Sequence, residues 1–263
     1  MNPQKRRMRL VVWMTRQAML RLGIVVCLIA LIATVFLSEI PSSRTWTHWT
    51  LPLSGKVIAL DAGHGGADGG AVSREGVIEK DLNLAIVLYL RDYLQQAGAL
   101  VLLTREGDYD LAAPETRSQA RRKTEDLLRR ADQVSKQRAD MTISIHMNSI
   151  PSPRWSGAQT FYSTKNAEGK RLATDIQSEL RSALGNTQRV AKEADSVYLL
   201  KTLEMPTALV EVGFLSHPEE ARLLANEEYQ RKVAASIYRG VLKFASEAPG
   251  SSGRSGASGE PVL

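Results

Sequence analysis

Short apolar runs and amphipathic helical patterns alternate along this chain from residue 56 onward, and this alternation constrains the fold most. The run Val57–Gly63 is apolar and ends in glycine, which predicts a buried strand, and Glu79–Gly98 has apolar residues four apart, which predicts an amphipathic helix. Strands that alternate with helices predict an α/β domain with a largely parallel sheet. Further strands are expected at 99–104, 141–146, 158–163 and 207–214, and further helices at 117–138, 166–184 and 227–245.

An uninterrupted apolar stretch, Leu22–Leu37, precedes this domain. Its 16 residues are longer than most signal-peptide cores and slightly shorter than a typical spanning helix of about 17–25 residues. Six basic residues and no acidic residue come before it, so the positive-inside rule places residues 1–21 in the cytoplasm. Because no small-residue cleavage pattern follows, we expect residues 22–38 to be an uncleaved membrane anchor, with a cleaved signal segment as the alternative.

The net charge of +6 comes from the N-terminus. Residues 1–50 hold seven of the 34 Lys and Arg residues and one of the 28 acidic residues, so residues 51–263 carry equal numbers of both. A neutral domain behind a basic segment indicates a membrane end and argues against a nucleic-acid partner. The single cysteine, Cys27, excludes an intrachain disulfide and a cysteine-rich zinc site.

Two further segments lack periodicity. Residues 39–54 contain Trp46 and Trp49 and are expected to be a linker, whose tryptophans lie at the membrane interface or wrap onto the domain. Residues 247–263 are rich in Gly and Ser and are expected to be a disordered tail. The folded catalytic domain is therefore expected at residues 55–246.

Candidate chemistry gathers where strands are expected to end. His64 lies in the glycine-rich segment Asp61–Ala71, which is neither a dinucleotide-binding loop nor a P-loop, and whose glycines let the backbone fold closely around an ion or substrate. His146 ends the strand 141–146, and the carboxyl ends of strands in an open α/β sheet build the functional site. Two of the four histidines stand at such positions, which favours one shared site.

Two glutamates add carboxylates to this set. Glu79 opens the helix after the glycine-rich segment, where a carboxylate also interacts well with the helix dipole, so its role stays open at this point. Glu211 lies inside an apolar strand, where an unpartnered carboxylate is costly to bury, which favours a functional role. Two histidines, a carboxylate and an open position form the usual catalytic zinc set, and a further glutamate would serve as general base.

Five motifs in this order resemble those of the zinc-dependent N-acetylmuramoyl-L-alanine amidases, the Amidase_3 family of bacterial cell-wall enzymes. They are DAGHGGADGGAV from Asp61, Glu79 at a helix start, LLTRE from Leu102, SIHMNS from Ser144 and PTALVEVGFLSHPEE from Pro206. The resemblance covers about residues 55–246 and implies a phosphorylase/hydrolase-like α/β fold, with a mixed, mostly parallel sheet flanked by helices. It implies one Zn²⁺ per domain, held by His64, Glu79 and His146. The catalytic glutamate would be Glu211.

Other charged and polar residues have two interpretations each. Asn148 either binds substrate or braces the loop of His146. Arg105 either meets an anionic stem peptide or, as we expect, forms a structural ion pair. The segment Arg117–Arg138 has eight bases against three acids, which predicts a solvated helix or a face toward anionic wall polymer or a partner.

The resemblance implies hydrolysis of the amide between the lactyl group of N-acetylmuramic acid and L-alanine in peptidoglycan. Ser163 passes almost directly into the helix at Asn166, which leaves no room for the regulatory insertion of division amidases. A chain with an N-terminal anchor and the segment KTEDLL at 123–128 resembles the amidases that mature the spore cortex. Those enzymes strip stem peptides before muramic-δ-lactam forms. A zinc peptidase cutting within the stem peptide, a vegetative autolysin and a wall-binding module without catalysis are the alternatives.

This reading places the catalytic domain outside the cytoplasm. It would be membrane-anchored or secreted, in the cell wall or in the intermembrane space of the forespore. Since an amidase without a blocking insertion needs restraint, we expect it from the anchor or from an activating lipoprotein partner that orders the ligand loops.

Overall fold

The computed structural model describes residues 15–37 and 51–246 of the 263-residue chain. These residues belong to two units, which divide between Thr50 and Leu51, and each unit is described by itself. The basic segment 1–14, the linker part that holds Trp46 and Trp49, and the tail 247–263 lie outside the described residues.

The first unit contains one helix, α1 (Arg16–Leu37), which begins before the apolar run. Its residues Arg16–Thr34 are long and apolar enough to cross a membrane, and the side chains of this span are not buried inside the protein. A core helix of a soluble domain would bury this surface, so α1 fits the predicted anchor or signal segment.

A six-stranded sheet forms the second unit, in the order β2-β1-β3-β6-β4-β5. Strand β4 runs antiparallel to β6, and every other neighbouring pair is parallel. The predicted mixed, mostly parallel sheet is therefore confirmed. The strands are β1 (Val57–Ala62), β2 (Leu100–Leu103), β3 (Met141–Asn148), β4 (Gln159–Tyr162), β5 (Lys192–Glu193) and β6 (Thr207–Phe214).

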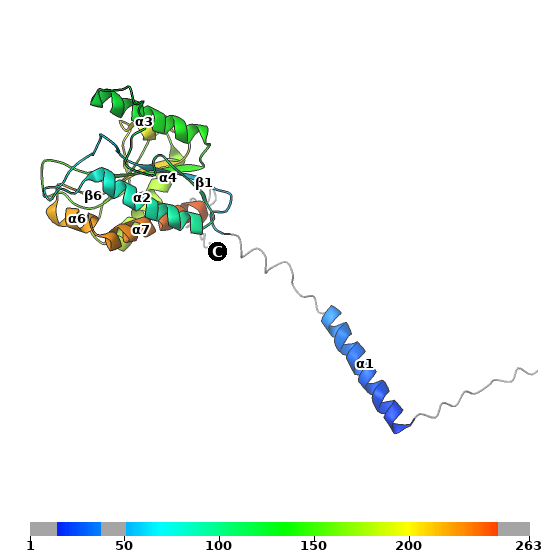
Figure 1. The fold of residues 1–263 in the computed structure, drawn as a ribbon. Helices are drawn as coiled ribbons and strands as arrows, with labels where there is room; N and C mark the ends of the chain where they lie inside the picture. Colours follow the sequence, from blue (N-terminus) through cyan, green and yellow to red (C-terminus); the bar gives the residue numbers. More distant parts are fainter. Residues whose placement is uncertain (1–14, 38–50, 247–263) are drawn as a thin grey trace, which may run out of the picture. The chain divides into compact units, whose positions relative to one another are not determined.

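Helices cover both faces of the sheet (Figure 1). Helices α2 (Glu79–Gln96), α4 (Ala167–Leu184) and α7 (Glu227–Ser246) pack together on one face, and α3 (Gln119–Lys136) lies with α5 (Tyr198–Thr202) on the other. The short helix α6 (Pro218–Leu224) connects β6 to α7. Helix α2 buries its apolar stripe in the main core, as its four-residue spacing predicts: Leu82, Ile86, Leu90 and Leu94.

The domain begins a few residues before the expected boundary. Leu53 is fully buried in the main core, and its N–H donates to the carbonyl of Ala97. Residues 51–54, which the sequence assigned to the linker, thus pack onto the domain.

Helix α3 is not the fully solvated helix that its charge suggests. Its inner face buries Asp126, Arg130, Ala131 and Val134, and Arg130 is only 2% exposed. The reason is a partner far away in the sequence: Arg130 forms buried ion pairs with Asp61 of β1 and with Asp126. Because the two charges are paired, Asp61 of β1 and Arg130 can both remain buried and ionised.

Candidate metal centre and active site

Three residues from separate elements meet at the carboxyl ends of β1 and β3. His64 follows β1, His146 lies near the end of β3, and Glu79 is the first residue of α2. Strands β1 and β3 are parallel neighbours, with Ala62 paired to Ile145, so the residues just beyond are held side by side. Gly63 allows this approach, because a Cβ there would lie 2.3 Å from Cε1 of His146.

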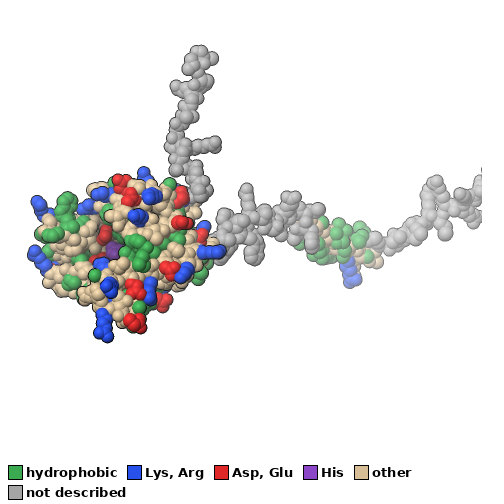
Figure 2. Space-filling model, turned by 90° about the horizontal axis from the view of Figure 1, so that it is seen from above, with side chains coloured by type: hydrophobic (Ala, Val, Ile, Leu, Met, Phe, Trp, Pro, Cys, Tyr) green, Lys and Arg blue, Asp and Glu red, His purple; other side chains and the backbone are tan. Residues whose placement is uncertain are grey.

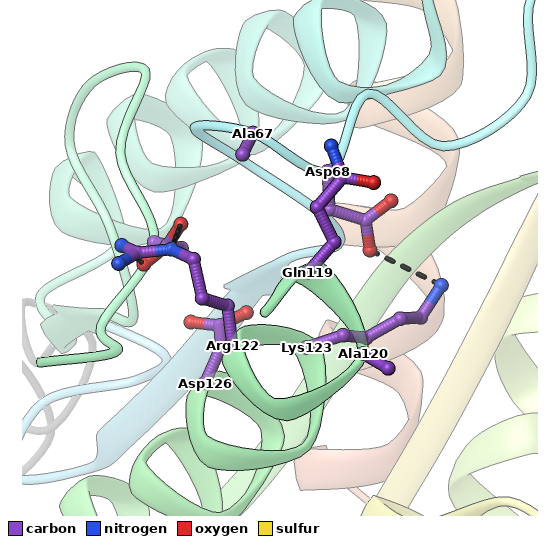
Figure 3. A pocket seen from close by; sticks show the side chains of 8 residues that line it. Ala67, Asp68, Gln119, Ala120, Arg122, Lys123 and Asp126 are labelled. Carbon is purple, nitrogen blue, oxygen red and sulfur yellow. Dashed lines mark hydrogen bonds and ion pairs between the residues drawn. The ribbon is translucent and has the colours of Figure 1, made fainter. Parts of the chain in front are cut away.

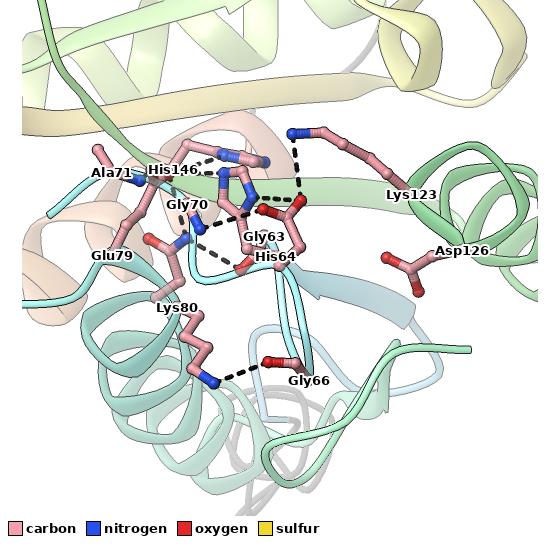
Figure 4. A network of polar contacts seen from close by, with 12 residues as sticks. Gly63, His64, Gly66, Gly70, Ala71, Glu79, Lys80, Lys123, Asp126 and His146 are labelled. Carbon is pink, nitrogen blue, oxygen red and sulfur yellow. Dashed lines mark hydrogen bonds and ion pairs between the residues drawn. The ribbon is translucent and has the colours of Figure 1, made fainter. Parts of the chain in front are cut away.

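The side chains of these residues converge on one oxygen. Nε2 of His64 and Nδ1 of His146 each lie 3.1 Å from Oε1 of Glu79 (Figure 4). One ligand atom from each residue lies within 4.8 Å of the other two, so the group could hold a metal ion. Two imidazoles and one carboxylate leave a coordination position open, as catalytic zinc sites do.

Backbone groups fix the carboxylate of Glu79. Its Oε1 accepts the N–H of Met147, and its Oε2 accepts the N–H of Ala71. Burial alone raises the pKa of Glu79, but hydrogen bonds from His146 and His64 outweigh it and hold the pKa well below its usual range. Glu79 is therefore an anion with a set orientation, suited to a cation.

Asp68 orients His64. Its Oδ2 lies 2.9 Å from Nδ1 of His64, and hydrogen bonding keeps the pKa of Asp68 low despite partial burial. Nδ1 therefore donates to the ionised Asp68, and this contact directs Nε2 toward Glu79, where it could serve as a metal ligand once deprotonated. This is the carboxylate–histidine arrangement that typically stands behind a metal ligand.

Two buried arginines hold the backbone around His64, which has the left-handed φ of 62° that is uncommon outside glycine. Arg130 donates to the carbonyls of Ala62 and His64. Arg105 donates to the carbonyls of Ala62, Gly63, Lys80 and Gly107. The structural ion pair expected for Arg105 is not seen among the described residues, because backbone oxygens take its N–H groups instead. These hydrogen bonds thereby fix the backbone of residues 62–64.

Asp61 supplies the countercharge to this pair of arginines. It accepts hydrogen bonds from Arg130, Thr104 and Ser144 while it is almost completely buried. Burial raises its pKa, but the charges of Arg130 and His146 and the hydrogen bond from Ser144 bring the pKa to about 2.

Glu211 lies beside the metal-ligand group on β6. Its Cα pairs with that of His146 across the two strands, so both side chains point to the same face of the sheet. Its Oε2 is buried and has no hydrogen-bond partner among the described residues. Burial raises the pKa of Glu211 to about 7, with a smaller contribution from the charge of Glu79. An unpartnered carboxyl with a pKa near neutrality is poised to exchange a proton.

These groups face a cavity of about 270 Å³ between α3 and α5. Its lining includes His64, His146 and Glu211, with the apolar side of Val197–Leu199 opposite. Histidine and acidic side chains show together at the domain surface in the space-filling view (Figure 2). The carbonyl of Asn148 accepts the N–H of Leu215, but Asn148 is not among the described lining residues, so its substrate role stays a prediction.

Sequence reasoning missed several residues that shape this site. Asp68 stands four residues after His64 in the glycine-rich segment, a spacing that could have indicated the pair. Arg130 was hidden in a charged helix, although the apolar spacing of Leu127, Ala131 and Val134 marks the inner face beside it.

The sequence of the folded unit matches a known family. Residues 58–243 match the Amidase_3 family of N-acetylmuramoyl-L-alanine amidases. The chain belongs to the Amidase_3 family.

Relatives of this Amidase_3 chain agree in sequence and in fold. The germination-specific N-acetylmuramoyl-L-alanine amidase of Bacillus subtilis (strain 168) is 50% identical over 213 residues, which cover 81% of this chain and 90% of that protein. The CwlD amidase of Clostridioides difficile, solved in complex with the GerS lipoprotein, is 42% identical with a TM-score of 0.71, covering 73% of this chain and 98% of that one. The catalytic domain of CwlV from Bacillus (Paenibacillus) polymyxa var. colistinus is 31% identical with a TM-score of 0.63, covering 72% and 97%.

The close approach at Gly63 gives a test of the candidate metal site that leaves His64, Glu79 and His146 unchanged. In Gly63→Ala the new Cβ would lie within 2.7 Å of three atoms of the His146 ring, so the ring must leave its position. We expect the affinity for Zn²⁺, measured by competition with a chelating dye, to fall by about 10- to 100-fold, as when a ligand loses its orientation.

Gly69→Ala is the matched control in the same loop. A Cβ at Gly69 meets only Ile78 Cγ2, at an ordinary 3.5 Å, so metal affinity should stay at the wild-type value. Equal affinities for the two variants would show that the contact between Gly63 and His146 does not position the ring.

Proposed function

We propose that this chain is a zinc-dependent amidase that hydrolyses the amide between the lactyl group of N-acetylmuramic acid and L-alanine in peptidoglycan. His64, Glu79 and His146 hold the zinc ion, and Glu211 acts as general base. The carrying observation is the position of Glu211, a buried carboxylate without a partner that pairs across β6 and β3 with a histidine of the ligand group.

The residues present fit zinc. Two imidazole nitrogens and one carboxylate oxygen are the donor types that catalytic zinc sites use, and the three atoms lie within 4.8 Å of one another. Asp68 and the backbone N–H groups of Ala71 and Met147 provide the supporting contacts that set ligand orientation. When bound, zinc supplies Lewis-acid polarisation of a carbonyl and activation of water.

The chain's own residues then carry out the proton transfers. Glu211 faces the same side of the sheet as His146, so it lies next to a carbonyl placed at the ligand group. It takes a proton from the attacking water and returns it to the nitrogen of the leaving L-alanine. Its raised pKa, about 7 from burial, favours the second transfer, and a bound cation favours the ionised form needed for the first.

Three narrower assignments belong to this proposal. The chain strips stem peptides during spore cortex maturation, before muramic-δ-lactam forms; the 50% identity to a germination-specific amidase supports this role. Only residues 163–166 separate β4 from α4, so no blocking insertion is present there. Residues 22–38 anchor or export the chain, and residues 51–246 form the catalytic domain, outside the cytoplasm at the wall or in the forespore intermembrane space.

A lipoprotein partner is also part of the proposal. The related CwlD amidase was solved in complex with the GerS lipoprotein, and this supports an activating partner of the same kind here. Wall hydrolysis by the purified chain alone, at saturating zinc, tests this need: full activity without any partner would remove it.

The bond that is cut is tested by product analysis. The full-length chain in detergent, loaded with zinc, is incubated with purified cortex and vegetative peptidoglycan, and the fragments are weighed by mass spectrometry. We expect peptides with free L-alanine N-termini and glycan without peptide. Shortened peptides still attached to glycan would instead identify a peptidase, and equal action on both walls would favour a general autolysin.

A further inference from the structure

Lys123 of α3 reaches over the active-site cavity. Its Nζ lies 3.1 Å from Oδ2 of Asp68, and the same oxygen lies 2.9 Å from Nδ1 of His64 (Figure 4). Lys123 lines the cavity that holds His64, His146 and Glu211, and its side chain is 63% exposed. A partly exposed cation therefore lines the cavity, and it is linked to His64 through Asp68.

The other cation of this cavity cannot meet a substrate. Arg130 is buried and is committed to Asp61, Asp126 and two backbone carbonyls. By contrast, the structure describes one partner for the ammonium of Lys123, which has three N–H donors. Of the two described Lys and Arg side chains that line the cavity, Lys123 is thus the one with N–H donors left for an arriving anion.

A second cavity continues beyond Lys123. It has a volume of about 180 Å³ and lies along the start of α3, between Ala67 and Gln119 (Figure 3). Lys123, Asp68 and Asp126 line both cavities, so the two cavities adjoin at the lysine. A substrate longer than the scissile amide has room in this direction.

We propose that Lys123 determines specificity by binding the α-carboxylate of the second stem-peptide residue. This inference rests on the proposed function, since the residue after L-alanine in a stem peptide is a γ-linked glutamate with that carboxylate. An extended residue spans about 3.5 Å, so the carboxylate of the second residue lies within about 7 Å of the scissile bond, a distance that the two adjoining cavities can accommodate. The stem peptide then runs along the start of α3.

Asp68 sharpens the discrimination. With Lys123 present, the ammonium bridges Asp68 and the substrate carboxylate, and charge-assisted hydrogen bonds are the strong ones. Without Lys123, an incoming carboxylate faces the carboxylate of Asp68 directly, and like charges repel. Loss of the lysine therefore penalises an anionic substrate and leaves a neutral one almost unaffected.

Two synthetic disaccharide tripeptides provide the test. They differ only at the second residue, which carries an α-carboxylate in one compound and an α-carboxamide in the other. With the zinc-loaded full-length chain in detergent, we expect wild type to prefer the carboxylate by about tenfold in kcat/KM, mainly through KM. Lys123→Gln should lose this preference, and Lys123→Arg should keep it.

Lys136→Gln is the matched control, because Lys136 lies on the same helix and is exposed beside Asp132. It should retain the wild-type preference. Calorimetric binding of both compounds to the zinc-loaded Glu211→Gln protein, with and without Lys123→Gln, repeats the comparison without turnover.

The outcomes separate the two proposals. The role of Lys123 is overturned if the protein with Lys123 binds both compounds equally well. It is also overturned if Lys123→Gln weakens the binding of both compounds by the same factor. If wild type hydrolyses neither compound but the binding preference depends on Lys123, the proposed reaction fails and the recognition of the carboxylate stands.

Discussion

Replacing Glu211 by glutamine is expected to lower the hydrolysis rate by about 10²–10⁴-fold, while the fold and the bound zinc are kept. Glutamine has the shape of the carboxyl group but cannot take a proton from water. Because Oε2 of Glu211 has no partner among the described residues, the substitution breaks no hydrogen bond there. It also removes a charge whose burial is unfavourable, so the thermal midpoint should not fall.

The measurement is single-turnover hydrolysis of peptidoglycan fragments with zinc content determined on the same sample. Glu228→Gln, an exposed carboxylate at the start of α7, is the control and should retain the wild-type rate. Turnover of the Glu211→Gln protein within a few-fold of wild type would assign the base to another residue.

Replacing any one of the three proposed metal ligands should strongly lower the affinity for zinc. His64→Ala, His146→Ala and Glu79→Gln are each expected to lower zinc affinity by more than about 100-fold. This loss is expected because each residue is one of the three proposed protein ligands, and the binding free energy of zinc is on the order of 10 kcal/mol. Zinc retained after dialysis against a chelator is the readout, and chelator treatment of wild type should abolish hydrolysis until zinc is restored.

His217→Ala distinguishes loss of a ligand from loss of any histidine. His217 caps α6, where its side chain accepts the N–H of Glu220, so its loss should cost about 1 kcal/mol of stability. Zinc affinity should be unchanged in that variant. Stoichiometric zinc in His64→Ala after the same dialysis would remove His64 from the ligand set.

The long elements of the fold were predictable because their periodicity is strong. Helix α2 shows its apolar stripe in the sequence, and β1, β3 and β6 are apolar runs of the length of buried strands. The two-residue β5 and the five-residue α5 are too short to show a period. The sequence also does not predict that β4 runs antiparallel to β6, although the alternating burial of β4 is typical of antiparallel strands.

The grouping of His64, Glu79, His146 and Glu211 was predictable because each stands at a chemically marked place, a strand end, a helix start or an apolar strand. The contacts of the two arginines that hold the backbone around His64 were not predictable. Arg130 is 69 residues from its partner Asp61, and sequence alone does not show that a charged residue on a polar helix turns inward. The sequence favours an ion pair for Arg105, because the backbone carbonyl oxygens that accept its N–H groups have no sequence signature.

The contacts of Arg105 and Arg130 with the loop of His64 bear on how the proposed metal site would be loaded. Arg105 and Arg130 fix the carbonyls of residues 62–64, so the loop loses its conformational freedom when the domain folds. Metal capture then carries little ordering entropy, unlike in small zinc domains that fold only around their ion. In the proposed function, a chain exported without zinc could therefore take up the ion later, and zinc supply would control activity separately from synthesis. A partner that raises zinc affinity would have to act on the ligands or their electrostatics, because this loop is already ordered.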